Sequence, residues 1–287
     1  FVACTVSELL PRDLRERLIA AGVTPLQGLD DGLFALAAAA NYHDRRLALS
    51  TAALPRPAPR VAADRAAAKI LDEWQGKRRL AAFGLTVPEG RLVGYAELGA
   101  AAEEIGFPVV LKACGAPFAH KSELGAVRLG LRSRDEVRLA ADSIRAAVGA
   151  RGLAVESFLL ERMIDHGVAE LIVGIHRDPQ FGPTLVIGSG GILVELVGDS
   201  ASLLLPTDRA SVERALESLK LATLLRGFRG KPPGDTAAAI EAILKIAAFA
   251  EAHWEALEEL DVNPLIVLPQ GQGAVAVDAL LCLSGTN

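Results

Sequence analysis

The sequence predicts an α/β chain built from α+β subdomains, and three observations support this class. Apolar residues make up 51% of the 287 residues, which is enough to bury a sizeable core in more than one domain. Segments with helical periodicity alternate along the chain with short β-branched runs, and Gly, Pro and Asp-containing turns separate them. A chain of this length is expected to hold about two domains.

Charge and composition exclude several classes of function. The formal net charge of −5 argues against a general nucleic-acid binder, which carries a basic surplus. The longest apolar runs fall far short of the roughly 18–20 residues that cross a bilayer, so we expect no membrane partner. The three cysteines lie far apart and form neither a disulfide framework nor a zinc pattern, which suits a reducing, cytoplasmic compartment.

Residues 1–50 are expected to be the end of a preceding domain. A helix over 11–21 begins with Pro and stops before Gly22, and a short strand and an Ala-rich helix follow it. This fragment is too small to fold alone. Residues 51–69 are rich in Pro and Ala and are expected to be a linker. Because the chain begins with Phe1 rather than Met, we expect a piece of a longer protein or a processed product.

Residues 70–158 are expected to form a first α+β subdomain. Asp72 is placed to cap a helix that ends before Gly84. Ser133 and Glu136 have the spacing of a capping box, which predicts a helix from Arg134 onwards. Between these two helices the pattern predicts a helix over 95–105 and strands over 108–114 and 126–131.

Residues 159–287 are expected to form a second subdomain, rich in strands. Turn sequences separate four predicted strands, over 153–164, 168–178, 183–188 and 192–198. Two helices follow, over 211–225 and, capped by Asp235, over 236–252. The chain closes with two strands, over 262–268 and 274–281, joined by a Gly-rich turn.

Lys112 and the loop after it are the first candidate for chemistry, since the sequence has no P-loop and no G-x-G-x-x-G. Lys112 ends a buried strand and is either an edge residue that extends to solvent or a phosphate ligand. His120 lies in a loop bounded by Gly115 and Gly125, beside Lys121. It is either a solvated loop histidine or a neutral nucleophile near pH 7.

Asn263 and Asp278 are the candidates for a metal site. If the last two strands pair around Gln270, these residues lie opposite each other, with Cβ atoms roughly 4.5–5.5 Å apart. Mg²⁺ prefers such oxygen ligands, although two polar residues on the wet face of a hairpin would give the same pattern. Glu195, in an otherwise apolar run, is a candidate third metal or phosphate-network residue.

Glu161, Met163 and Glu170 are weaker candidates. The two carboxylates could accept hydrogen bonds from an adenine amino group and from ribose hydroxyls, or they could be plain surface charges. Met163 suits core packing and also suits the wall of a base pocket.

Four segments together carry a family resemblance: KACGAPFAHKSELGAVRLGL, ELIVGIHRDPQFGPTLVIGSGGILVEL, LLRGFRGKPPGD and ELDVNPLIVLPQGQGAVAVDA. They resemble, in order and spacing, the ATP-grasp portion of the ADP-forming acyl-CoA synthetases, which is related to the β subunit of succinyl-CoA synthetase. The resemblance runs from about Ile70 to Leu281. Residues 1–50 resemble the tail of the Rossmann/flavodoxin-like CoA-ligase domain that precedes this portion in fused members.

The resemblance implies an ATP-grasp fold and the reaction acid + CoA + ATP to acyl-CoA + ADP + phosphate. The acid is activated as an acyl phosphate, and phosphohistidines carry the phosphoryl group to or from the nucleotide. ATP or ADP, Mg²⁺ and CoA are the implied ligands. His120 is the implied shuttle, and Lys112 and, with less support, Lys77 hold phosphates. The remaining roles are adenine and ribose contacts for Glu161, Met163 and Glu170, and Mg²⁺ binding for Asn263 and Asp278 with Glu195 nearby.

Two departures from the family pattern bear on these expectations. The family reads H-K-S-D-x-G-G-V where this chain has Glu123 and Ala126, and an alanine in place of glycine stiffens a loop. The CoA-binding domain and most of the ligase domain are not in this sequence. We therefore expect the chain to bind nucleotide, to need the missing domains or subunit for the overall reaction with CoA and a carboxylic acid, and to belong to an oligomer.

Two alternatives come from other functional classes. One is a nucleotide-sensing ATP-grasp module of an acetyltransferase-type fusion protein, although no acetyltransferase sequence is present. The other is a noncatalytic subunit-interface domain. The presence of Lys112, His120, Asn263 and Asp278 argues against the second alternative.

Overall fold

The chain forms two compact units, Phe1–Ala58 and Pro59–Asn287, which are considered separately. The structure, a computed structural model, describes residues 2–4, 10–51, 68–115, 118, 124–178, 180–190 and 198–284. The boundary between the units falls within the range predicted as a linker, 51–69. None of the helices in the described ranges is both long and apolar enough to span a bilayer.

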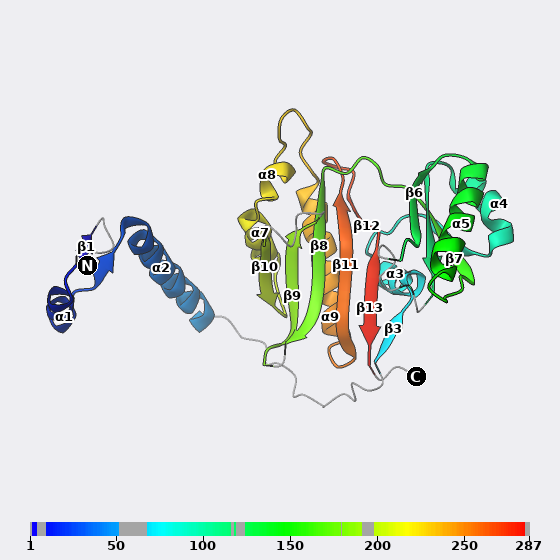
Figure 1. The fold of residues 1–287 in the computed structure, drawn as a ribbon. Helices are drawn as coiled ribbons and strands as arrows, with labels where there is room; N and C mark the ends of the chain where they lie inside the picture. The colour runs from blue at the N-terminus through cyan, green and yellow to red at the C-terminus, as the bar shows by residue number, and fades with distance from the viewer. Residues whose placement is uncertain are drawn as a thin grey trace. The chain divides into compact units, whose positions relative to one another are not determined.

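The N-terminal unit is a β–α–β–α fragment (Figure 1). Its elements are β1 (Val2–Cys4), α1 (Arg12–Ala20), β2 (Pro25–Gln27) and α2 (Leu29–Thr51). Strands β1 and β2 pair in parallel, as a helical crossover between neighbouring strands requires. Strand β1 is not among the elements predicted from the sequence. That this unit is the end of a Rossmann-like CoA-ligase domain stays a prediction.

A large antiparallel sheet dominates the second unit, in the strand order β10-β9-β8-β11-β13-β3, with β12 beside β11 (Figure 1). Its strands are β3 (Lys69–Leu71), β8 (Ala169–Asp178), β9 (Gly182–Ser189), β10 (Ser200–Leu204), β11 (Leu257–Val267), β12 (Ala274–Ala276) and β13 (Ala279–Leu283). Consecutive side chains on β8 alternate between buried and exposed, so one face is packed and the other is open.

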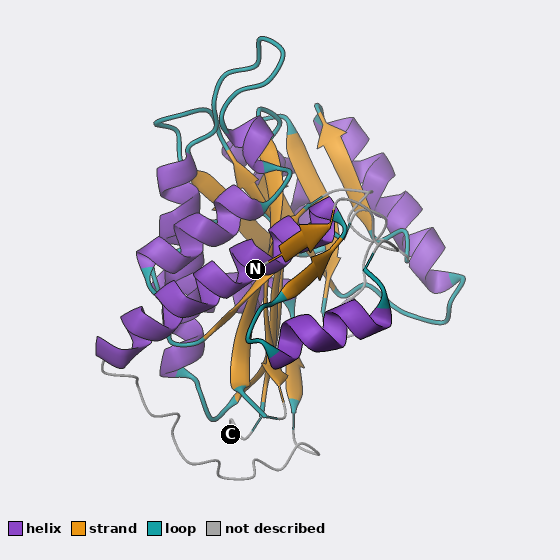
Figure 2. Cartoon of the chain, turned by 90° about the vertical axis from the view of Figure 1, so that its left-hand side faces the viewer, coloured by secondary structure: helices purple, strands orange, loops and turns teal. Residues whose placement is uncertain are grey.

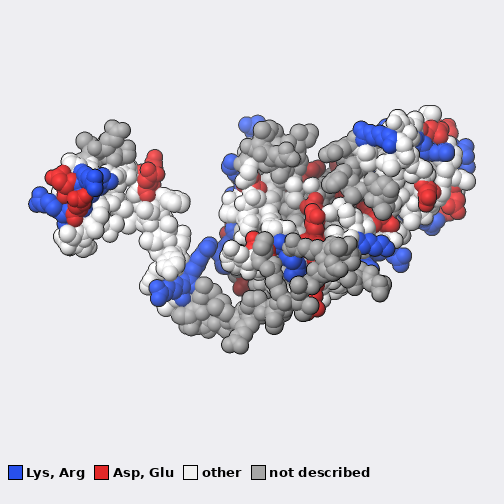
Figure 3. Space-filling view, turned by 60° about the horizontal axis from the view of Figure 1, so that its bottom comes forward, with Lys and Arg blue, Asp and Glu red and all other residues white. Residues whose placement is uncertain are grey.

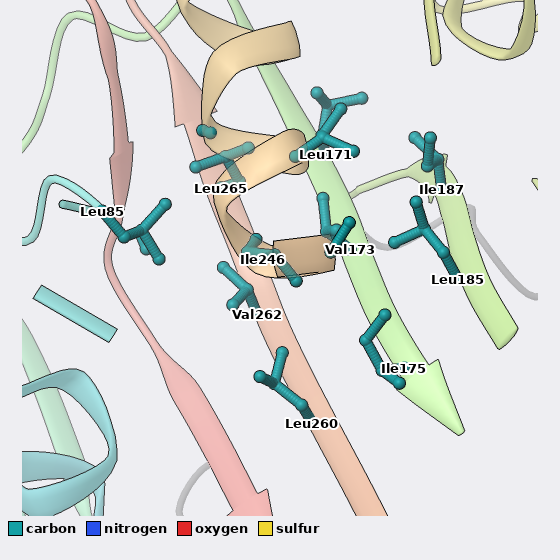
Figure 4. Packing of buried hydrophobic residues seen from close by; sticks show 14 of the residues in the cluster. Leu85, Leu171, Val173, Ile175, Leu185, Ile187, Ile246, Leu260, Val262 and Leu265 are labelled. Carbon is teal, nitrogen blue, oxygen red and sulfur yellow. The ribbon is translucent and has the colours of Figure 1, made fainter. Parts of the chain in front are cut away.

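Helices cover the packed face of this sheet (Figure 2). They are α7 (Arg209–Ser218), α8 (Ala222–Leu225) and α9 (Thr236–Ala252). Ile246 of α9 lies over the strands beside Val173 and Val262, and all three are fully buried (Figure 4). Because α9 takes up one face of the sheet, the polar residues of β11 are left on the other face.

A smaller antiparallel sheet has the strand order β4-β7-β5-β6. Its strands are β4 (Gly90–Val93), β5 (Val109–Cys114), β6 (Val127–Leu131) and β7 (Ser157–Arg162). A short 3₁₀ turn (Tyr95–Glu97) leads into α4 (Leu98–Ile105), which packs with α5 (Arg134–Gly149) over a separate core. The predicted subdomain boundary between residues 158 and 159 falls inside β7, which belongs entirely to this sheet.

Helix α3 (Glu73–Ala82) follows β3 of the large sheet in the sequence and precedes β4 of the small sheet. It packs against β13 of the large sheet. A Cβ atom at Gly76 would lie 3.5 Å from the Leu281 Cβ, so the glycine allows a close approach. The predicted N-cap is present, because Asp72 Oδ1 accepts a hydrogen bond from the Gln75 N–H at 2.8 Å. The cap fixes where α3 begins and therefore where its first-turn side chains point.

One predicted detail of the second subdomain is wrong, and one of its strands was not predicted. The helix predicted over 211–225 is interrupted at Leu219, whose ψ of 145° is extended. The Asp199 carboxylate accepts hydrogen bonds from the Lys220 and Leu221 N–H groups, which favours a new helix start there over continuation of α7. Strand β10 was not predicted, because its alternation of small and apolar residues is short.

Candidate active site

Four charged side chains are buried together where the two sheets meet. Glu73 and Lys77 stand one turn apart on α3, Lys112 lies on β5 and Glu161 on β7. Their exposed fractions are 6%, 2%, 6% and 2%, respectively, and we call them the buried charge cluster. Charged groups are almost never so buried unless they are paired.

Short contacts join every cation of the cluster to both carboxylates. Glu73 Oε1 lies 2.7 Å from Lys77 Nζ and 2.5 Å from Lys112 Nζ. Glu161 pairs with Lys77, and its Oε2 lies 3.1 Å from Lys112 Nζ. The two lysines balance the two glutamates in formal charge, so the attraction between them offsets part of the cost of burying four charges.

The Val277 carbonyl ties this cluster to the large sheet. It accepts hydrogen bonds from Lys112 Nζ at 2.7 Å and from Lys77 Nζ at 3.3 Å. Val277 lies between β12 and β13, directly before Asp278. The two ammonium groups are therefore held next to the hairpin that carries the candidate metal ligands.

Lys112 is charged in this setting. Burial opposes the charge, but Glu73, Glu161 and Asp278 together outweigh it and raise the pKa of Lys112 above its usual value. The prediction that Lys112 is a phosphate ligand is consistent with a permanent cation at this point. Among the described residues on the face drawn in Figure 3, basic and acidic side chains are interspersed and form no extended basic patch.

The hairpin pairing predicted from the sequence is found. Strand β11 pairs with β12 and β13 in one register, in which Val262 faces Ala279 and Leu265 faces Ala276. Asn263 therefore lies opposite Asp278, and its N–H donates a hydrogen bond to the Asp278 carbonyl at 3.2 Å. Both side chains offer hard oxygen ligands, which fit Mg²⁺.

The described residues include no group of three His, Cys, Asp or Glu side chains that could hold a metal ion by themselves. A cation at Asn263 and Asp278 would need further oxygen ligands. Mg²⁺ is commonly bound by one or two carboxylates together with substrate phosphates and water, so the donor set fits a metal–nucleotide site better than a metal cage.

Asp261 belongs to this site and was not singled out from the sequence. It lies two residues before Asn263 on β11, hence on the same face of the sheet. Burial, Glu259 and Asp278 raise its pKa, whereas the Asn263 amide acts in the opposite sense. Gly174 faces it on β8, and a Cβ there would lie 3.7 Å from Asp261 Oδ1. The alternation of Asp and Asn in D-V-N was the signal that could have identified it.

Glu73 was also missed, although a glutamate four residues before Lys77 is the usual spacing of an ion pair on a helix.

Glu161, predicted to contact adenine, has a carboxylate engaged by both lysines. Met163 follows β7 directly, and its N–H donates to the Pro108 carbonyl at 3.0 Å. Glu170 is exposed near the start of β8, and no contact described for it joins it to the cluster. The adenine and ribose roles of these residues stay predictions.

His120 and Glu195 lie outside the described residues. Ala126, at the end of the predicted shuttle loop, is fully buried in the core of the small sheet, and its carbonyl accepts a hydrogen bond from the Ala113 N–H at 2.9 Å. The methyl group that departs from the family pattern is thus part of the packing under β5.

Comparisons with known proteins show the family to which the fold belongs. A family model described as an ATP-grasp domain matches residues 62–283. A trans-feruloyl-CoA synthase from an unknown prokaryotic organism is 39% identical over 215 residues, which are 74% of this chain and 30% of that protein. The β subunit of an ADP-forming acetate–CoA ligase from Pyrococcus furiosus is 33% identical over 216 residues, and the match covers 74% of this chain and 91% of the subunit.

Solved structures of an acetyl-coenzyme A synthetase also resemble this chain in fold and sequence. A dinucleotide-forming acetyl-coenzyme A synthetase from Candidatus Korarchaeum cryptofilum, in complex with coenzyme A and Ca-AMPCP, matches with a TM-score of 0.71 and 37% identity, over 75% of this chain and 93% of that chain. The same protein has been solved with coenzyme A and Mg-AMPPCP and a phosphohistidine segment pointing towards the nucleotide binding site. That structure matches with a TM-score of 0.63 and 35% identity, over 74% of this chain and 91% of that chain.

Breaking the buried charge cluster should cost far more stability than breaking an exposed pair. In Lys112→Met, two buried carboxylates share one ammonium group, and we expect a loss of about 3–5 kcal/mol in the free energy of unfolding. Urea unfolding of the variant and the wild type measures this loss.

The matched control is Arg91→Met, which removes the partner of Glu104 at a site where both side chains are more than half exposed, 55% and 56%. There we expect a loss of at most about 1 kcal/mol. Equal losses in the two variants would contradict the structural role given to the cluster.

Proposed function

The chain belongs to the ATP-grasp family of the ADP-forming acyl-CoA synthetases, and we propose that it is the ATP-binding, phosphoryl-transferring part of such an enzyme. The reaction proposed for the whole enzyme is acid + CoA + ATP to acyl-CoA + ADP + phosphate. One observation carries the proposal: two lysines donate to the Val277 carbonyl, directly before Asp278. The cations proposed to bind phosphate are therefore held next to the oxygens proposed to bind the metal.

The residues of this site have separate tasks. Lys77 and Lys112 pair with phosphate oxygens and offset their negative charge. Asn263 and Asp278 would hold Mg²⁺, which would supply further charge neutralisation at the phosphates. Phosphoryl transfer depends on such positioning and charge stabilisation more than on covalent help from the protein. Glu195 is proposed to complete the metal or phosphate network.

His120 is the proposed phosphoryl carrier. In the direction of acyl-CoA formation, an imidazole nitrogen bonds to the γ-phosphorus of ATP as the bond from that phosphorus to ADP breaks. The phosphoryl group then passes through the ligase domain to the acid as an acyl phosphate, from which CoA displaces phosphate. The phosphohistidine segment of the archaeal synthetase supports this proposal.

Glu161, Met163 and Glu170 are proposed to surround adenine and ribose. Met163 and Glu170 flank the connection from β7 to β8, which joins the small sheet to the large one. A base held there would lie near the lysines, because Glu161, two residues before Met163, contacts both of them. Glu161 already pairs with both lysines, one through each carboxylate oxygen, and each oxygen keeps a second acceptor site for the adenine amino group.

The rest of the enzyme lies outside the matched region of this chain. The chain spans 30% of the length of the feruloyl-CoA synthase but 91% of the acetate–CoA ligase β subunit. We propose that CoA, a carboxylic acid and the CoA-binding and ligase domains, fused or as a separate subunit, are its partners in a cytoplasmic oligomer. The relatives reported above are CoA ligases or synthases, which favours this function over a nucleotide-sensing module.

Nucleotide binding should depend on Mg²⁺ through Asp278. Calorimetry with ADP should give at least about tenfold tighter binding with Mg²⁺ than without it, and Asp278→Ala should abolish the difference, because a carboxylate ligand is lost. Glu259→Gln, at an exposed acid on the same strand as Asn263, is the control and should keep the Mg²⁺ effect. Equal Mg²⁺ effects in wild type and Asp278→Ala would exclude the metal assignment.

The phosphoryl-carrier role predicts a phosphoprotein. Together with the ligase portion of a relative, CoA and a panel of carboxylic acids, the wild-type chain should release ADP from ATP and carry phosphate on His120, detected by mass spectrometry. His120→Ala should bind ADP normally but form no acyl-CoA. Acyl-CoA formation at the wild-type rate in His120→Ala would rule out the shuttle.

A further inference from the structure

Glu73 has a place in the site that the proposed function does not explain. One carboxylate oxygen, Oε1, contacts the ammonium groups of both Lys77 and Lys112, and the Glu73 side chain is only 3% exposed. Glu73 comes from the helix packed on the large sheet, whereas Lys112 comes from the small sheet. The carboxylate therefore joins the two lysines to each other across the junction of the sheets.

Each lysine already has three oxygen partners around its ammonium group, two of them in hydrogen bonds. An ammonium group has three N–H donors. Lys112 Nζ contacts Glu73 at 2.5 Å, Glu161 at 3.1 Å and the Val277 carbonyl at 2.7 Å. Lys77 Nζ has the same three partners. A phosphate oxygen that binds either lysine therefore competes with these partners for the N–H donors and for the positive charge.

The charges of the cluster also oppose the binding of a phosphate group. The cluster is neutral, so an added phosphate would leave it with more anions than cations in a region of low dielectric constant. The Val277 carbonyl is fixed by the backbone between β12 and β13, and Glu161 stands on β7, an inner strand of its sheet. Glu73 stands in the first turn of α3, where the helix dipole stabilises a carboxylate that has lost a cation.

We propose that Glu73 is a positioning residue that acts as the internal counter-ion of the phosphate site. Its carboxylate holds Lys77 and Lys112 side by side and is displaced by the phosphates of the nucleotide. This inference rests on the proposed function, because it assigns the two lysines to phosphate. It predicts that Glu73 opposes the binding of phosphate groups and has no effect on the binding of the nucleoside.

The test compares ligands that differ only in phosphate. Glu73→Gln keeps an oxygen that accepts from both lysines but removes the competing charge. Calorimetry without Mg²⁺ should show ADP binding about tenfold tighter than to wild type, AMP binding tighter by less, and adenosine binding unchanged. A role in folding alone would change the affinity of all three ligands alike.

Two further variants test whether the change in ADP affinity is specific to Glu73 and depends on the lysines. Glu89→Gln removes a carboxylate that is 65% exposed, outside the cluster, and should leave ADP affinity at the wild-type value. In the Lys112→Met background, Glu73→Gln should change ADP affinity much less than in wild type, because the effect passes through the lysines. An ADP affinity of Glu73→Gln equal to or weaker than wild type would overturn the inference. Failure of wild type to bind ADP would instead overturn the proposed function.

A measurement on the wild-type chain covers the case in which Glu73→Gln does not fold. Hydrogen exchange should change in the first turn of α3 when ADP is bound at saturation, since Glu73 exchanges partners there. Saturation with adenosine should leave exchange in this turn unchanged. Identical exchange in the two complexes would overturn the inference.

Discussion

Two lysine ammonium groups are buried where the two sheets meet, and the site depends on the two carboxylates that keep them there. Burying either charge alone would cost several kcal/mol, so Lys77 and Lys112 can occupy this place only with Glu73 and Glu161. The four residues come from α3, β5 and β7, and the lysines also donate to Val277 of the large sheet. The same contacts that join the sheets therefore fix the spacing between the cations and Asp278.

The large sheet provides the second half of the site by leaving one face open. Helix α9 packs on the other face, where Ile246, Val173 and Val262 are buried. Strand alternation then places Asp261 and Asn263 on the open face, and the hairpin register brings Asp278 opposite Asn263. The oxygens proposed to bind Mg²⁺ lie near the buried cations because Val277 and Asp278 are consecutive residues between β12 and β13.

Local patterns predicted part of this arrangement. The caps at Asp72 and Asp235 and the facing pair Asn263 and Asp278 follow from residues close in sequence, and the structure contains them. Glu73 could not be assigned in the same way, because its contact with Lys112 spans 39 residues and two sheets. The break at Leu219 depends on Asp199, a residue remote from the helix it interrupts. Long-range polar contacts of this kind leave no periodic trace in the sequence.

The central claim is that Lys77 and Lys112 lie on the phosphate path beside the metal ligands of the hairpin. A crystal structure of the chain with Mg²⁺ and a non-hydrolysable ATP analogue tests it directly. We expect phosphate oxygens within about 3 Å of both lysine Nζ atoms. We expect a Mg²⁺ ion about 2.1 Å from oxygens of Asn263 and Asp278. Phosphates bound away from both lysines, with the buried charge cluster unchanged, would contradict the claim.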